Sequence, residues 1–171
     1  EGAVDAVGAA LDKAPELEQA AKRFSDVQSL FFLGRGLDWA LANEGSLKLK
    51  EISYIHCEAY AAGELKHGTI SLITEGIPVI ALATQQRLMG KMVSNIKEVK
   101  ARGADVLLIA KSDETVSHDV ADTLVTLSPI DDLFMPFPAV VLLQLIAYYT
   151  AKERGCDIDK PRNLAKSVTV E

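Results

Sequence analysis

A lysine near the end of the chain, Lys166, is the residue whose setting best suits covalent chemistry. It lies in residues 161–171, PRNLAKSVTVE, where the β-branched residues after it are able to pack as an ordered extension over a core. A lysine amine beside a partly desolvated pocket has a lowered pKa and can attack a carbonyl carbon to form a Schiff base. The alternative interpretation is a surface lysine on a frayed terminus.

Three charged residues, Glu44, Lys48 and Glu51, follow one another at helical spacing. Positions i, i+4 and i+7 lie on one face of a helix, so this charged row predicts two acids and one base side by side. The apolar positions Leu41 and Leu49 adjoin the row, and partial burial tunes a carboxylate toward general-base catalysis. The alternative is a set of solvated ion pairs, each contributing a few tenths of a kcal/mol.

His67 is a third candidate for acid or base chemistry. It is followed by Gly68, which permits a tight backbone turn and lets the imidazole project from a loop. A single histidine is also compatible with a structural role, and this alternative stays open. His56 and His118 have no comparable context in the sequence.

The bulk composition is that of an ordinary soluble globular domain. Hydrophobic residues make up 49% of the 171 residues and charged residues 25%. The net charge of -6 provides no basic surface for nucleic acid. The two cysteines, Cys57 and Cys156, lack the spacing of a zinc site or a disulfide framework, so we expect a cytoplasmic protein without a structural metal. The most apolar stretch, Ala139–Tyr149, is too short to span a membrane.

Short apolar runs alternate with helical patterns along the chain, and this alternation predicts the fold. Strands separated by helices form right-handed crossovers and a parallel sheet that is covered on both faces. We therefore expect an α/β fold, a three-layer α-β-α sandwich around a mostly parallel, doubly wound sheet. The expected strands are 29–33, 78–83, 105–110 and 124–127, and the expected helices are 38–54, 86–102 and 134–154, after two leading helices within 3–24.

This pattern divides the chain into leading helices in residues 1–25, an α/β domain in 26–155 and a C-terminal tail in 156–171. Ligands of doubly wound sheets bind beyond the carboxyl ends of the strands. Gly34–Gly36 and Thr84–Gln86 should both lie on that rim. Neither has the glycine pattern of a dinucleotide or nucleoside triphosphate loop, so NAD and ATP are not supported.

Two long strings connect these residues to a known family. Residues 44–68, EGSLKLKEISYIHCEAYAAGELKHG, and the tail 157–171 closely resemble the glutamine–fructose-6-phosphate aminotransferases (isomerizing), or glucosamine-6-phosphate synthases. The resemblance covers essentially the whole chain, which looks like the second of two sugar isomerase (SIS) subdomains. The glutaminase domain and the first SIS subdomain are then missing, and because residue 1 is Glu we expect a piece of a longer protein. The resemblance implies no metal and no organic cofactor.

The family converts fructose 6-phosphate and glutamine to glucosamine 6-phosphate and glutamate, and the resemblance implies roles for five residues. Lys166 is similar to the lysine that forms a Schiff base with C2 of the open-chain ketose, and Ala165 beside it is expected to contact substrate. Glu51 resembles the base that moves a proton between C1 and C2. Lys48 is similar to a lysine that assists proton handling near the sugar hydroxyls, and Glu44 is a weaker candidate for substrate contact.

His67 resembles the residue that opens the sugar ring, which in the family reaches the site from the partner subunit. The resemblance therefore implies a homodimer in which His67 serves the partner's site. The family commonly has a proline after the His-Gly pair, whereas this chain has Thr69, so we expect an altered loop start there.

The phosphate of the substrate has no obvious anchor in this chain. The family holds it mainly on a Ser/Thr-rich loop of the first SIS subdomain, whereas residues 84–87, TQQR, have one hydroxyl and no glycine. We therefore expect the fragment to have lost most of its affinity for the sugar phosphate and to be inactive alone. Two alternatives stay open: a non-catalytic SIS module that binds a sugar phosphate or mediates dimerisation, and another SIS enzyme such as a deglycase.

Overall fold

Five parallel strands form the central sheet of the computed structural model, which describes residues 2–114, 116, 117 and 119–164. The strands follow the order β2-β1-β3-β4-β5, and every neighbouring pair is parallel. The order reverses between β1 and β3, so the loops after these two strands flank the switch point of the sheet. The strands are β1 (Ser29–Gly34), β2 (His56–Ala61), β3 (Pro78–Ala83), β4 (Asp105–Lys111) and β5 (Thr123–Leu127).

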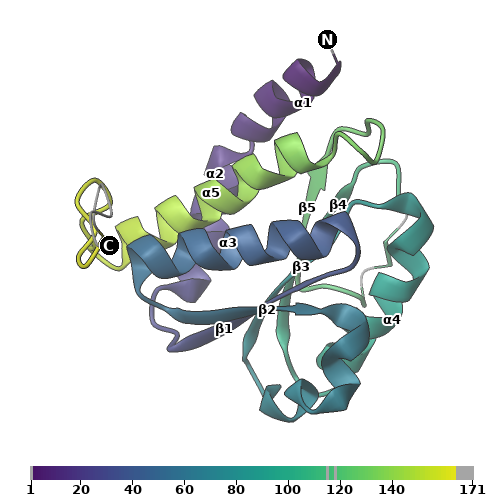
Figure 1. Ribbon diagram of the computed structural model, residues 1–171, viewed down its shortest axis with the longest axis horizontal. Helices are drawn as coiled ribbons and strands as arrows, with labels where there is room; N and C mark the ends of the chain where they lie inside the picture. Colours follow the sequence, from purple (N-terminus) through teal and green to yellow (C-terminus); the bar gives the residue numbers. More distant parts are fainter. Residues whose placement is uncertain (1, 115, 118, 165–171) are drawn as a thin grey trace, which may run out of the picture.

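Helices cover both faces of this sheet (Figure 1). One face packs against α3 (Leu37–Ser53) and α5 (Pro136–Glu153), with α1 (Gly2–Leu11) and α2 (Ala14–Ala21) lying against α5. The other face packs against α4 (Met89–Lys100) and the short 3-10 helices η2 (Ala62–His67) and η3 (Thr69–Leu72). Two further 3-10 turns are η1 (Lys22–Phe24) and η4 (Gln86–Leu88). Within the described residues, no helix is long and apolar enough to cross a membrane.

Alternating side chains of the strands divide the core into two layers. Phe32 and Ile80 pack on the side of α3 and α5, whereas their neighbours Phe31 and Val79 pack on the side of α4. All four side chains are buried, as a strand covered on both faces requires. The α/β three-layer sandwich predicted from the sequence is therefore confirmed.

Two elements differ from the sequence prediction. No strand is predicted at residues 56–61, yet β2 forms there. β2 is an edge strand paired only with β1, and half-buried polar residues such as Glu58 and Tyr60 interrupt the apolar run that identifies a central strand. The helix expected from residue 86 begins as η4 and becomes α4 only at Met89.

α3 runs from the edge of the sheet formed by the carboxyl ends of the strands (the carboxyl edge) back to the edge formed by their amino ends (the amino edge). It begins after Gly36, whose φ is 59°, and ends at Ser53 just before β2 starts. Because α3 connects two parallel strands, it runs antiparallel to them. Near its middle, Ser46 Oγ donates a hydrogen bond to the carbonyl oxygen of Cys57 at 3.0 Å, which fixes this part of the helix beside the start of β2. The last turns of α3 therefore lie at the amino edge of the sheet.

Candidate functional site

The charged row of α3 forms in the structure as its spacing predicts. Lys48 Nζ donates a hydrogen bond to Glu51 Oε2 at 2.8 Å and lies 3.8 Å from Glu44 Oε1. The side chains of Lys48 and Glu51 are 34% and 26% exposed, and the adjacent Leu49 is fully buried. The row therefore lies at the margin of the buried face of the helix, where a substrate can reach it.

The pair Lys48–Glu51 places a proton donor beside a proton acceptor. The hydrogen bond to Glu51 raises the pKa of Lys48 above its ordinary value, so the amine stays protonated at neutral pH. A protonated amine is not a nucleophile, but it can donate a hydrogen bond or a proton to a substrate oxygen. The pair is therefore suited to acid–base chemistry, and a nucleophile must come from elsewhere.

His67 lies at the carboxyl edge of the sheet, opposite to the amino edge where α3 ends. It ends η2, which follows the carboxyl end of β2, and its side chain is 73% exposed, with Nδ1 2.8 Å from Glu64 Oε2. β2 has 6 residues and separates this histidine from the last turns of α3 by roughly 20 Å. The structure therefore does not bring His67 together with Lys48 and Glu51 within one chain. Thr69, after the His-Gly pair, begins η3.

The predicted nucleophile Lys166 and its neighbour Ala165 lie outside the described residues. The described part of the tail ends at Leu164, and it is attached beside the end of α3. The backbone N–H of Arg162 donates a hydrogen bond to Tyr54 Oη at 2.9 Å, and Tyr54 is the residue that follows α3. The tail therefore reaches the same edge of the sheet as the Lys48–Glu51 pair.

A buried network that the sequence analysis missed lies at the carboxyl edge. Asp38, in the first turn of α3, is 1% exposed and accepts hydrogen bonds from Thr84 N at 2.8 Å and Thr84 Oγ1 at 2.6 Å. Burial raises the pKa of Asp38 above its ordinary value, although the hydrogen bonds from Thr84 oppose this shift. The available signal in the sequence is an acidic residue two positions after the Gly34–Gly36 loop.

Donors of the loop after β3 are therefore engaged within the protein. Thr84 supplies the only hydroxyl of residues 84–87, and Asp38 holds it. The backbone N–H of Gln86 donates a hydrogen bond to the carboxylate of Asp132 at 3.0 Å, and Lys111 Nζ donates to the same carboxylate at 2.8 Å. Carboxylates of the protein thus occupy donors that an anionic ligand would need. In the described part of the chain, no three His, Cys, Asp or Glu side chains are grouped as a metal site requires.

The structure is a doubly wound α/β domain that carries an acid–base pair on its first crossover helix. A family model of the SIS domain matches residues 23–153, from η1 to the end of α5. The match covers most of the chain, so this chain belongs to the SIS domain family.

Its relatives are more specific. The chain is 59% identical over 144 residues to the glutamine–fructose-6-phosphate aminotransferase (isomerizing) of Clostridium acetobutylicum, which covers 84% of this chain and 24% of that protein. It is 55% identical to the protein of the same name from Caldanaerobacter subterraneus, over 98% of this chain and 28% of that protein. The chain thus spans about a quarter of the length of these curated relatives.

A solved structure agrees with this relationship. The C-terminal domain of glucosamine-fructose-6-phosphate aminotransferase from Francisella tularensis superposes with a TM-score of 0.88 at 39% identity, covering 93% of this chain and 45% of that chain. This chain therefore corresponds to somewhat less than half of that domain. The resemblance to the aminotransferases predicted from the sequence is confirmed.

Proposed function

We propose that this chain is the second SIS subdomain of a glutamine–fructose-6-phosphate aminotransferase and supplies the acid–base residues of its sugar site. The full-length protein would convert fructose 6-phosphate and glutamine to glucosamine 6-phosphate and glutamate. The similarity to the aminotransferases supports this proposal. The observation that carries it is the Lys48–Glu51 pair at 2.8 Å, because a ketose-to-aldose step needs a proton acceptor and a donor side by side. Free thiols at Cys57 and Cys156 are consistent with a cytoplasmic enzyme.

The proposed chemistry begins at the tail lysine. The amine of Lys166 adds to C2 of the open-chain sugar, and loss of water leaves an iminium ion. Ammonia from glutamine then replaces the lysine nitrogen at C2, which frees Lys166. The remaining C=N bond acidifies the hydrogens on C1, so Glu51 can remove one of them and deliver it to C2 through an enolamine. The C1 hydroxyl loses its proton as the aldehyde forms, and the ammonium of Lys48 can donate a hydrogen bond to that oxygen.

His67 is proposed to act in the site of a partner subunit. The length of β2 between His67 and the last turns of α3 supports this proposal, because one chain alone does not bring these groups together. An imidazole that takes the proton of the C2 hydroxyl and returns it to the ring oxygen would open the sugar ring. Each site would then need two chains, as in a homodimer.

We also propose that the isolated chain binds fructose 6-phosphate weakly and is inactive alone. Asp38 holds the hydroxyl and the N–H of Thr84, so the loop after β3 offers little to a phosphate. Titration calorimetry of the isolated chain with fructose 6-phosphate tests this directly. Tight binding would contradict it.

Borohydride trapping of the full-length protein tests the proposed function. Reduction in the presence of fructose 6-phosphate should convert the Schiff base to a stable secondary amine, and peptide mass mapping should place the added mass on Lys166. Lys166→Arg should abolish the label, whereas Lys160→Arg, the matched control in the same tail, should keep it. An active enzyme without a label on Lys166 would rule out the proposed nucleophile.

A further inference from the structure

The residue that follows α3 has a backbone conformation that is rare for its type. Tyr54 has φ 62° and ψ 16°, in the left-handed region. Helices that end in this conformation usually carry Gly or Asn at that position, because a larger side chain is strained there. An aromatic residue at this position therefore costs stability and calls for a compensating contact.

Two independent contacts join Tyr54 to the C-terminal tail. Its ring lies 4.1 Å from the guanidinium carbon of Arg162, a cation–π contact, and its Oη accepts a hydrogen bond from the Arg162 backbone N–H at 2.9 Å. In the described part of the chain, no carboxylate forms an ion pair with Arg162. The guanidinium is therefore held by the ring. We call Tyr54 and Arg162 the tail clasp.

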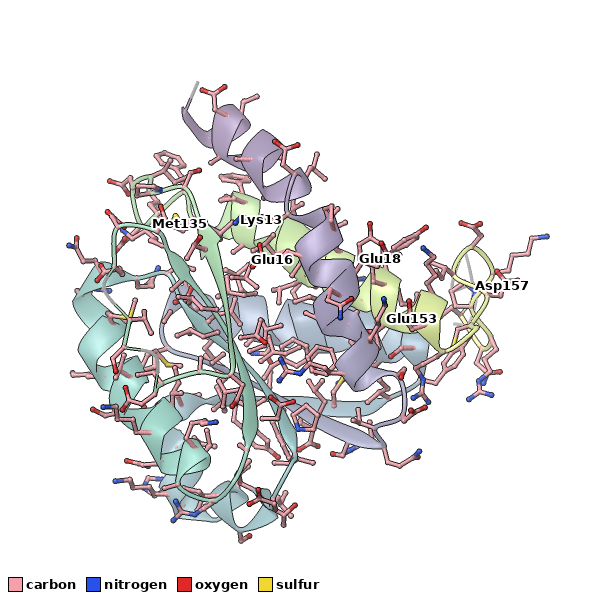
Figure 2. The ribbon with its side chains drawn as sticks, turned by 180° about the vertical axis from the view of Figure 1, so that it is seen from behind. Lys13, Glu16, Glu18, Met135, Glu153 and Asp157 are labelled. Atoms are coloured by element: carbon pink, nitrogen blue, oxygen red, sulfur yellow. The ribbon has the colours of Figure 1, made fainter. Side chains whose placement is uncertain are left out.

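The helix side of the tail clasp is rigidly supported. Arg154 Nε, just after α5, donates to the carbonyl oxygen of Ser53 at 2.9 Å, and its Nη1 donates to the carbonyl oxygen of Val27 at 3.4 Å. Figure 2 shows Glu153 at this end of α5, with Asp157 in the tail beyond it. The ends of α3 and α5 are thus tied together before the tail crosses Tyr54.

The position of the tail clasp relates it to both parts of the proposed site. Tyr54 follows Glu51 by three residues along the chain, and Arg162 precedes Lys166 by four. The clasp lines a polar cleft of about 660 Å³ at this edge of the sheet. We propose that Tyr54 and Arg162 are positioning residues that set the register of the C-terminal tail against the helix that carries Glu51. This inference rests on the proposed function and adds to it the device that orients the nucleophile.

The two contacts of the tail clasp can be removed separately. Tyr54→Phe removes the hydroxyl and keeps the ring, whereas Arg162→Ala removes the guanidinium and keeps the backbone N–H. Tyr54→Gly removes both contacts and also relieves the left-handed conformation, so it should not weaken the end of α3. Tyr148→Phe and Arg102→Ala, both exposed and not among the residues that line the cleft, are the matched controls.

The readout is the rate of borohydride trapping at Lys166 with fructose 6-phosphate in the full-length protein, measured together with the melting temperature. Tyr54→Phe and Arg162→Ala should each lower the trapping rate by about threefold, the size of one such contact. Tyr54→Gly should lower it by about tenfold while the melting temperature stays the same or rises.

Three outcomes distinguish the ideas. Controls that match the parent, with the graded losses above, support the positioning role. Parent rates in the clasp variants, or a loss in Tyr54→Gly that runs parallel to a lower melting temperature, would overturn it while leaving the proposed function intact. Absence of label in the unaltered protein would instead reject the proposed function itself.

Discussion

The two ends of α3 each hold an acidic side chain against a polar partner, but their surroundings are opposite. In the first turn, Asp38 is 1% exposed and both of its oxygens accept hydrogen bonds from Thr84. In the last turns, Glu51 is 26% exposed and accepts a hydrogen bond from Lys48. A buried acidic side chain with internal partners keeps those partners hydrogen-bonded, whereas a partly exposed one can exchange its partner for a substrate. We call the first turn of α3, which holds the buried Asp38, the closed end, and the last turns, which hold the accessible Glu51, the open end.

This difference places the proposed chemistry away from the usual location. In doubly wound sheets ligands generally bind at the switch point, beyond the carboxyl ends of the strands. Here Asp38 accepts a hydrogen bond from Thr84 in the loop after β3, at that point. The accessible Lys48–Glu51 pair lies instead at the amino edge, where the tail also arrives. Accessible groups, more than strand topology, indicate where a substrate would react in this chain.

The largest effect should come from Glu51→Gln at the open end. This nearly isosteric change removes the proposed base, so the aminotransferase activity of the full-length protein should fall by about 10²- to 10⁴-fold. The free energy of unfolding should change by about 1 kcal/mol or less, because a solvent-accessible ion pair contributes little. Steady-state kinetics and urea unfolding measure the two quantities.

Glu18→Gln is the matched control for this prediction. Glu18 accepts a hydrogen bond from Lys152 at 2.7 Å in a comparable exposed pair between α2 and α5, away from the charged row. Its substitution should leave the activity unchanged. Loss of activity in the control, or full activity in Glu51→Gln, would remove the contrast between the two ends of α3.

The second effect should come from Asp38→Ala at the closed end. The N–H and the hydroxyl of Thr84 would be left buried without their partner, which should lower the free energy of unfolding by about 3 kcal/mol. Asp12→Ala, at an exposed position after α1, should change it by about 0.5 kcal/mol or less. Urea unfolding of the chain measures both. If Asp38→Ala were as well tolerated as the control, the closed end would have no stabilising role.

The sequence predicts the open end of α3 much better than the closed end. Helical spacing alone places Glu44, Lys48 and Glu51 on one face, because neighbours on a helix surface are fixed by local geometry. The contact between Asp38 and Thr84 joins residues that are 46 positions apart, so it depends on the pairing of β1 with β3. No local pattern encodes such a contact.

The same distinction explains the fold prediction. Central strands such as 78–83 are continuous apolar runs and are predicted correctly, since burial on both faces determines their composition. The edge strand 56–61 is missed, because one side of it has no strand partner and polar side chains are tolerated there. The tail clasp is likewise beyond sequence reasoning, since it joins Tyr54 to Arg162 across 108 positions.

The smallest expected effect concerns only the charge of Asp38. Asp38→Asn keeps a side chain that can accept from the N–H of Thr84 and donate to its hydroxyl, so most of the hydrogen bonding is retained. Burial raises the pKa of Asp38 above its ordinary value of 3.8. At pH values just above 3.8, the folded parent therefore keeps the proton on the carboxyl group, whereas the unfolded chain has released it. Relative to Asp38→Asn, the parent's free energy of unfolding should therefore fall as the pH rises through that range and level off above it.

Urea unfolding of the parent and Asp38→Asn at a series of pH values, starting near 3.8, measures this difference. If the parent's free energy of unfolding instead rises relative to that of Asp38→Asn as the pH rises, the hydrogen bonds from Thr84 outweigh burial and the carboxylate is the favoured form. Asp38 would then behave as an internal anion that the loop after β3 binds in its charged state. The closed and open ends of α3 would still differ in the access of their acidic side chains to solvent.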